Sequence, residues 1–421
     1  MLDGYSTALQ RIQALLDEGS FVQLSPKNNG VITGYGSVGE RLVFVYSQFG
    51  PVDSAHARCI CWLIELALQS GSPVVGIMDS DGVALASGEE VLDAYGAIFA
   101  SMGEASGIVP QISVIAGGCM GISSLLPQLS DFVIMSGGAK YFLESPAVQQ
   151  TDIRALSTES AGSAENHSKN TGLAHLALKT EQEAISAAKS LLLFLPHNHL
   201  DSTQAISPAS DVNYADSSLN AGRPGITSQQ VLSAVCDNGN FFEIQKHFAK
   251  TMRIGFAMLN GQTVGIALND GPLTADGADK AAWLVSFCDA YHIPLIFFTE
   301  SGKIVYSSAE QRGILKAVAR LVHASSNASV PKINIMYGDS SGSACAYMNV
   351  SADITFAWNT AKFTLMPNEA AEKLLACDSF ESGGAYSLIS PSETRKNLIS
   401  ALQMLSSKRP LRRPKKHYVV S

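Results

Sequence analysis

The sequence has little charge and no long apolar run. Only 16% of its 421 residues are Asp, Glu, Lys or Arg, while 46% are hydrophobic. This composition supplies apolar side chains for more than one large core, and low charge is typical of extensive subunit interfaces. No stretch approaches the roughly 20 apolar residues that a membrane helix needs. The N-terminal segment lacks the basic region and apolar core of a signal peptide, so we expect a cytoplasmic oligomer.

The sequence also lacks the usual signs of a metal site or a nucleic-acid interface. It has seven cysteines, an odd number, and no pair of them has zinc-ribbon spacing. No two of its nine histidines have metal-ligand spacing on a predicted helix. We therefore expect a reducing compartment and no structural metal. A net charge of −8 argues against general binding to nucleic acid, whose phosphates attract basic surfaces.

One basic cluster near the C-terminus departs from this acidic balance. It consists of Lys408, Arg409, Arg412, Arg413, Lys415 and Lys416. Charge runs of this kind are usually solvated. A contact with another subunit or with a phosphate group is the alternative interpretation.

Alternating helices and strands predict an α/β fold. Helical periodicity is found over residues 5–18, 56–69, 89–105 and 181–195. Short, wholly apolar runs, typical of strands buried on both faces, are found over 73–78, 110–115 and 131–135. A strand pair over 33–36 and 41–47 precedes them. This order predicts right-handed crossovers and a mostly parallel sheet.

The sequence contains an internal duplication. Three pairs of segments correspond in order: GERLVFVYSQ from Gly39 with GQTVGIALND from Gly261, SPVVGIMDSDG around Pro73 with IPLIFFTESGK around Pro294, and VPQISVIAGGCMG from Val109 with VPKINIMYGDSSG from Val330. The spacing is conserved between the copies: Pro73 and Pro110 are 37 residues apart, as are Pro294 and Pro331. The chain is therefore expected to be two copies of one unit.

We place the two domains at residues 1–222 and 223–421. The linker is expected within residues 197–224, which are rich in Ser, Asn, Asp and Pro.

In each copy a buried strand leads into a glycine-rich turn and then a helix. This geometry directs backbone N–H groups and the positive end of a helix dipole at one point. No acid, base or metal ligand stands out in either turn, so the predicted chemistry is stabilisation of a developing oxyanion by backbone donors. Because each half has one such turn, we predict that each half stabilises one oxyanion. Gly121 and Gly342 belong to these turns; close packing of strand against helix is their alternative role.

Segments along nearly the whole chain resemble one enzyme family. They include RIQALLDEGSFVQL (11–24), VITGYGSVGERLVFVYSQ (31–48), DNGNFFEIQKHFAKTMRIGFAMLNGQTVGIA (237–267) and FCDAYHIPLIFF (287–298). The chain resembles the carboxyltransferase β-type subunits of propionyl-CoA and methylcrotonyl-CoA carboxylases. It also resembles the α subunits of glutaconyl-CoA and methylmalonyl-CoA decarboxylases.

The resemblance implies an α/β fold of two tandem crotonase-like (ClpP/crotonase) domains related by duplication. It implies that the N-terminal half binds an acyl-CoA thioester and that the C-terminal half binds biotin. The implied reaction is carboxyl transfer to or from a small acyl-CoA. The implied partners are a biotin carrier protein, further copies of the chain in a dimer or hexamer, and a membrane subunit if the reaction is a decarboxylation. No Met-Lys-Met biotin-attachment motif is present, so biotin is expected on another chain.

The resemblance also implies the site residues. The catalytic backbone groups are expected at Gly121 and Ile122 in the first turn and at Gly342, Ser343 and Ala344 in the second. Binding of CoA and biotin is expected at Gly82, Cys119, Met120 and Gly302. One turn would polarise the thioester carbonyl, and the other would hold the biotin carbonyl. Ile122 and Ser343 stand where the family usually has glycine, which keeps the N–H but reduces the room beside it.

Two other functions fit parts of the sequence. The segment Gly338-Asp339-Ser340-Ser341-Gly342 matches the G-x-S-x-G nucleophile elbow, which would make the protein a serine hydrolase acting through Ser340. Only His417 follows Ser340 in the chain to act as its base. The third function is a non-catalytic scaffold subunit derived from the carboxyltransferase, which the altered glycines would permit.

Two pairs of charged residues occupy equivalent places in the halves. Lys140 and Lys362 follow the third strand of each half, where they contact a CoA phosphate or are solvated. Asp79 and Glu300 end the paired buried strands. They either cap the helices that follow or act near the site, and capping is the favoured interpretation.

Overall fold

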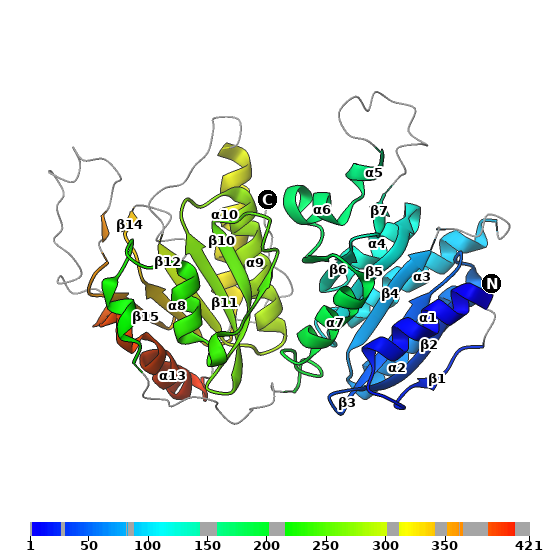
Figure 1. The fold of residues 1–421 in the computed structure, drawn as a ribbon, viewed down its shortest axis with the longest axis horizontal. Helices are drawn as coiled ribbons and strands as arrows, with labels where there is room; N and C mark the ends of the chain where they lie inside the picture. The colour runs from blue at the N-terminus through cyan, green and yellow to red at the C-terminus, as the bar shows by residue number, and fades with distance from the viewer. Residues whose placement is uncertain are drawn as a thin grey trace. The chain divides into compact units, whose positions relative to one another are not determined.

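The fold is taken from a computed structural model. It describes residues 2–26, 30–80, 82, 88–143, 158–201, 215–300, 311–341, 352–361, 363–364 and 386–408. The chain divides into two compact units, Met1–Ser202 and Thr203–Ser421. In Figure 1 the first unit runs from blue to green and the second from green to red.

The first unit is built on a mixed sheet with the strand order β1-β2-β3-β4-β5-β6-β8, and β7 pairs with the end of β5. The β1–β2 and β2–β3 pairs are antiparallel, and all later pairs are parallel. The strands are β1 Val22–Gln23, β2 Val31–Val38, β3 Arg41–Gln48, β4 Val74–Ser80, β5 Gln111–Met120, β6 Phe132–Ser136, β7 Lys140–Phe142 and β8 Leu176–Leu178.

Helices cover both faces of this sheet. Helix α1 (Leu2–Leu15) packs against α7 (Glu181–Leu192), and α2 (Ser54–Ser70) packs against α3 (Glu90–Ala105). Alternate strand residues such as Tyr46, Met78 and Ile115 join the core under α2 and α3. Their neighbours on the opposite face are also fully buried: Val45, Ile77 and Val114. This double burial explains the continuous apolar runs in the sequence.

The second unit repeats this topology. Its sheet has the order β9-β10-β11-β12-β13-β15-β17, and β14 and β16 form a separate parallel pair. The first two pairs are again antiparallel and the rest parallel. The strands are β9 Phe241–Ile244, β10 Met252–Leu259, β11 Gln262–Asp270, β12 Leu295–Glu300, β13 Lys332–Met336, β14 Ser340–Ser341, β15 Ile354–Trp358, β16 Phe363–Thr364 and β17 Tyr386–Ile389.

The helices of the second unit match those of the first. Helix α8 (Ser228–Val235) packs against α13 (Thr394–Leu405), and α9 (Ala275–Ala290) packs against α10 (Gln311–Asn327). The labels of Figure 1 allow the two sets to be compared. Short helical turns complete the two units: η2 Gly121–Ser124, α4 Leu125–Leu129, α5 Thr158–Ala161, α6 Ala164–Asn166, η3 His167–Thr171, η4 Ser217–Ala221, η5 Asp237–Gly239 and η6 Pro391–Glu393.

The strand registers confirm the predicted duplication. Val74 of β4 pairs with Gln111 of β5, and Leu295 of β12 pairs with Lys332 of β13. Both residues of the second pair follow their counterparts by 221 positions (295 − 74 and 332 − 111). The pairing of β14 with β16 likewise corresponds to the pairing of β5 with β7. The predicted α/β class and parallel crossovers are therefore confirmed.

The division between the units lies earlier than the predicted boundary at residue 222. Leu219 packs in the core of the second unit together with Ile226 and Val231. The backbone N–H of Asp216 also bonds to the carbonyl of Ser392. Residues 215–222 therefore belong to the second unit, because their apolar and main-chain contacts are made there.

Local side-chain and backbone signals set the helix ends. The Asp53 carboxylate accepts the N–H groups of Ala55 and His56 at the start of α2, and Gly71 ends the helix in the left-handed conformation. In α7, Thr180 and Glu183 form a capping box. Within the described ranges, every helix is too short or too polar to cross a membrane.

Candidate active site

The first glycine-rich turn follows the longest strand of the first unit. Strand β5 ends at Met120, and the helical turn η2 begins at Gly121. Gly121 has φ +63°, while a Cβ there would meet no atom within 4 Å. Glycine is therefore required by the left-handed backbone rather than by space. Because Gly121 and Ile122 open a helical turn, no earlier turn accepts their N–H groups. Gly121 and Ile122 are therefore the candidate backbone donors of this turn.

Buried tyrosines fix this turn from behind. The Tyr95 hydroxyl hydrogen-bonds the Ser123 hydroxyl, and the Tyr141 hydroxyl donates to the carbonyl of Ser124 at 2.8 Å. Burial raises the pKa of both tyrosines to about 12, so both hydroxyls remain protonated. The direction of the turn is consequently set by side chains of α3 and β7.

Cys119 contributes its backbone rather than its thiol. Its side chain is buried in the core, with Sγ 3.5 Å from the carbonyl of Ser123. Burial raises the pKa of the Cys119 thiol to about 12, which leaves it without thiolate at neutral pH. A nucleophilic role for Cys119 does not follow.

Gly82 lies beside the first turn. A Cβ on Gly82 would stand 3.5 Å from the carbonyl oxygen of Met120, and its backbone φ is +103°. The Ser80 hydroxyl accepts the Gly82 N–H at 3.2 Å, and the Gly82 carbonyl accepts the Val52 N–H at 2.9 Å. The structure therefore brings together three of the predicted residues, Gly82, Met120 and Gly121.

Asp79 binds the backbone that leads into the turn and does not cap the described helix α3. Its Oδ1 accepts the N–H of Gly118 at 3.1 Å, and its Oδ2 pairs with Arg11 at 2.7 Å. Helix α3 begins after Glu89, which makes no capping bond with its side chain. The capping role predicted for Asp79 is wrong, because the strand ends against the backbone of β5 well before α3 begins.

The second turn repeats the first as far as it is described. Ser340 and Ser341 form β14, the counterpart of the end of β5. Gly338 lies against Glu300, and a Cβ on Gly338 would stand 2.6 Å from the Glu300 Cδ. Glu300 is paired with Arg223. Burial raises the pKa of Glu300, although its hydrogen bond to Arg223 acts in the opposite direction.

Four predicted site residues lie outside the described residues: Gly302, Gly342, Ser343 and Ala344. Lys362 does so as well. Lys140 is described, in β7, where it is the register partner of Gly118. It is therefore adjacent to the strand that leads into the first turn.

The sequence was compared with models of known protein families. The model of the carboxyl transferase domain matches residues 2–380. The chain belongs to the carboxyl transferase domain family. The predicted family resemblance is thereby confirmed.

Relatives of this family differ in the direction of their reactions. The chain is 33% identical to the methylmalonyl-CoA decarboxylase subunit alpha of Veillonella parvula, over 98% of this chain and 92% of that protein. It is 31% identical to the propionyl-CoA carboxylase carboxyltransferase subunit of Haloferax mediterranei, over 98% of this chain and 93% of that protein.

A solved carboxyl transferase shares the fold. The structure of the transcarboxylase 12S hexamer, with hydrolysed methylmalonyl-CoA bound, matches with a TM-score of 0.92 at 29% identity. The match covers 98% of this chain and 92% of that one. The predicted pair of tandem crotonase-like domains is confirmed.

Sequence reasoning did not identify Arg11 and Glu181 as parts of the site. These residues are 170 positions apart, and α1 and α7 bring them together. The available signal was the acid at equivalent positions 79 and 300, each opposite a glycine at 117 or 338. An acid that faces a glycine backbone in both halves indicates a shared contact.

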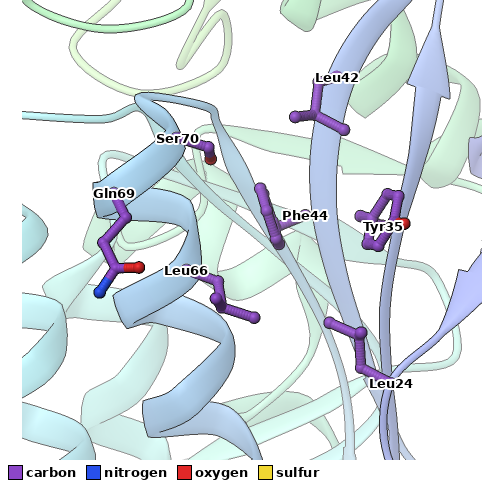
Figure 2. A pocket seen from close by; sticks show the side chains of 7 residues that line it. All are labelled: Leu24, Tyr35, Leu42, Phe44, Leu66, Gln69 and Ser70. Carbon is purple, nitrogen blue, oxygen red and sulfur yellow. The ribbon is translucent and has the colours of Figure 1, made fainter.

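Two grooves in the first unit lie near opposite ends of helix α2. One of about 340 Å³ (Figure 2) is lined by Leu24, Tyr35, Leu42, Phe44, Leu66, Gln69 and Ser70. Ser70 ends α2, so this largely apolar groove lies near the amino end of β4. The other, of about 430 Å³, includes Ser54 and Glu90, where α2 and α3 begin. Its lining residues belong to α2 and α3, so it lies between these two helices near their starts.

Proposed function

We propose that the chain is the carboxyltransferase subunit of a biotin-dependent acyl-CoA carboxylase or decarboxylase. The observation that carries the proposal is the first turn. There Gly121 and Ile122 begin a helical turn at the carboxyl end of β5 and are its candidate N–H donors. Its family supplies the reaction class. A turn of this kind suits a carbonyl oxygen that gains negative charge.

In the proposed reaction the first turn binds the thioester oxygen of a small acyl-CoA. Hydrogen bonds from Gly121 and Ile122 strengthen as an α-proton leaves and negative charge moves onto that oxygen. The α-carbon then forms the new C–C bond to CO₂. In the decarboxylation direction the C–C bond breaks first, and the same donors hold the resulting oxyanion. The loss of one such donor typically raises the barrier by about 3 kcal/mol.

The second turn is proposed to hold the biotin ureido carbonyl. The described part fits this role, because β14 repeats the paired strand extension that precedes the first turn, and Gly338 lies against an acid in the same way. The proposed donors are Gly342, Ser343 and Ala344, and Gly302 is proposed as a further residue that binds biotin. Biotin on a partner chain supplies the carboxyl group and accepts the substrate proton.

The halves are proposed to divide the substrates. The N-terminal half, with Gly82, Cys119 and Met120 around the first turn, takes the acyl-CoA. The C-terminal half takes biotin from a carrier protein. Copies of the chain would bring the two kinds of turn together in an oligomer, in the cytoplasm. A membrane decarboxylase subunit is a further partner if the physiological direction is decarboxylation.

A serine hydrolase is not favoured by the geometry at Ser340. Its side chain is buried, and Oγ lies 3.3 Å from the carbonyl of Gly338. A nucleophile must instead be presented to a substrate. The scaffold alternative draws on the altered glycines, but Ile122 and Ser343 both retain the N–H that the reaction uses.

The proposal is tested by titrating the purified protein with malonyl-CoA, methylmalonyl-CoA and glutaconyl-CoA and with their uncarboxylated products. Binding and CO₂ release are followed together, with and without free biotin. Thioester binding with biotin-dependent CO₂ release is the expected result. Thioester binding without turnover under any condition would favour a scaffold, and fluorophosphonate labelling at Ser340 would favour a hydrolase.

A further inference from the structure

The parallel ladder between β4 and β5 is interrupted beside the first turn. The strands pair regularly up to Met78 and Ile115, and the register shifts before they pair again at Ser80 and Cys119. Irregularities of this kind re-aim side chains and are frequent next to active sites. Asp79 lies at the interruption, and its carboxylate accepts the N–H of Gly118. A side chain has taken the place of a strand carbonyl as the hydrogen-bond acceptor.

Arg11 holds this carboxylate in one direction. Its Nη1 lies 2.7 Å from the Asp79 Oδ2, while Nε and Nη2 bond to the two carboxylate oxygens of Glu181 at 2.9 and 2.8 Å. The Arg11 side chain is only 6% exposed. Burial by itself would lower the pKa of Arg11, but the hydrogen bonds that Arg11 donates to Glu181 and Asp79 raise it overall. The guanidinium therefore stays charged, with a fixed orientation.

Gly117 allows the carboxylate to lie directly on the strand. A Cβ on Gly117 would overlap the Asp79 carboxylate. Asp79 is therefore in close contact with the backbone at Gly117 and Gly118. Gly118 lies only three residues before Gly121. A displacement of this backbone passes into the turn, because Cys119 and Met120 are held in the β5–β7 ladder between them.

In the second half the equivalent acid lies against the equivalent glycine and pairs with a different arginine. Glu300 follows Asp79 by 221 positions (300 − 79), as Gly338 follows Gly117 (338 − 117). Arg223, which pairs with Glu300 at 2.6 Å, follows Arg11 by only 212 (223 − 11). The two arginines are therefore not duplicates of one position. Each half therefore pairs the acid near its turn with an arginine from a different part of the chain. This indicates that the acid in each half requires a cationic partner.

We propose that Asp79 and Arg11 are positioning residues that set the direction of the Gly121 and Ile122 donors. Asp79 acts through Gly118 and does not touch the substrate. The inference rests on the proposed function, since the group that the donors polarise is the thioester carbonyl. A buried network that satisfies all its members fixes geometry in this way, and a misplacement of 1 Å at a reacting centre can cost about 10²-fold in rate.

The first test compares Asp79→Ala with Asp79→Asn. The alanine variant removes the acceptor for the Gly118 N–H, so kcat should fall about 10²-fold with KM for the acyl-CoA unchanged. The asparagine variant keeps an oxygen at Oδ1 and should recover roughly tenfold of this loss. Lys189→Met is the control: Lys189 lies on α7, as Glu181 does, but pairs with Asp17 instead of Arg11, so kcat should equal that of the original protein.

The second test needs no turnover. The infrared stretch of a ¹³C-labelled thioester carbonyl should move to lower wavenumber when the acyl-CoA binds. In Asp79→Ala the band of the bound thioester should return toward that of the free one. A general loss of folding would lower the amount bound without moving that band. If the alanine variant does not fold, Asp79→Asn and Arg11→Lys carry the test, each with a partial return of the band.

The outcomes separate this proposal from the proposed function. An unaltered kcat and carbonyl band in the folded Asp79 variants would overturn the positioning role, while the reaction of the original protein would still stand. Absence of thioester binding and turnover in the original protein would instead refute the proposed function, and the positioning role with it. A fall in kcat with no change in the band would also contradict the proposal, because the donors would then point as before.

Discussion

Gly121 and Gly19 both have a positive φ, but only Gly121 lies in the proposed site. Their φ angles are +63° and +73°, and a Cβ on either would meet no atom within 4 Å. A substitution at either residue therefore adds the same left-handed strain, about 1–2 kcal/mol, without a steric clash. Only Gly121 supplies a donor to the proposed oxyanion. The pair separates the cost in folding from the cost in catalysis.

Gly121→Val should lower turnover by about 10²–10³-fold, because the altered backbone redirects an oxyanion donor. Gly19→Val should lose a similar amount of stability and keep its turnover. Thermal unfolding and steady-state kinetics of both variants check this prediction. Equal turnover in the two variants would remove Gly121 from the site.

His56 is a fully buried histidine that makes stability depend on pH. It lies in the first turn of α2 with its Nε2 3.1 Å from the Gln48 Nε2, and its exposed area is zero. Burial lowers the pKa of His56 to about 4 from 6.5, although Asp53 acts in the opposite direction. The unfolded chain therefore binds a proton at His56 between pH 6.5 and 4, where the folded protein does not.

This proton uptake predicts a loss of stability as the pH falls from about 6.5 to about 4, on the order of 3 kcal/mol. The stability from neutral His56 is fully present above pH 6.5. Urea unfolding at several pH values measures the slope, and His56→Gln should flatten it in this range. A slope that is the same in the variant would assign the pH dependence to other groups.

At the scale of elements, two equivalent hairpins are held by acids of different burial. Asp17 bonds to the N–H of Glu40 at the β2–β3 turn, and Asp237 bonds to the N–H of Gly261 at the β10–β11 turn. Lys189 pairs with Asp17 at a half-exposed site, 37% and 32% exposed. Arg395 pairs with Asp237 at a buried one, 4% and 6% exposed.

Arg395→Met should destabilise the protein by about 3–5 kcal/mol, because it leaves the buried Asp237 without its cation. Lys189→Met should cost about 0–1 kcal/mol, because water solvates the exposed Asp17. Chemical denaturation of the two variants gives the comparison. Similar losses in both would contradict the difference in burial as the cause.

The strands that sequence predicts well are those buried on both faces. The runs at 73–78, 110–115 and 131–135 correspond to β4, β5 and β6, because continuous apolar sequence follows directly from double burial. Strand β5 extends to Met120, five residues further than predicted. The extension depends on pairing with β7, which has only three residues and no apolar pattern of its own.

The contacts behind the first turn are not visible in the sequence for a similar reason. Arg11 meets Glu181 across 170 positions, and Asp79 meets Gly118 across 39. No local periodicity relates residues so far apart. A capping role for Asp79 was the natural local prediction, since acids at strand ends commonly begin helices, but the interruption of the β4–β5 ladder directs its side chain to the neighbouring strand.

At the scale of the whole molecule, duplication is the feature that made the fold predictable. Matched spacings of 37 residues between prolines reappear as matched hydrogen bonds: Pro73 accepts the N–H of Phe44 at 2.9 Å, and Pro294 accepts that of Gly265 at 2.8 Å. The same topology in both units follows. The domain boundary was less predictable, because polar residues before 222 gave no sign that Leu219 packs with the second core.

The central claim is that this protein moves a carboxyl group between an acyl-CoA and biotin. The most direct measurement is a single turnover with methylmalonyl-CoA carrying ¹⁴C in its free carboxyl group, in the presence of biotin. The account predicts biotin-dependent release of label from the thioester, in equal amount to the propionyl-CoA formed, and its loss in Gly121→Val. Retention of all label on the thioester at saturating protein, or release that is indifferent to biotin, would contradict it.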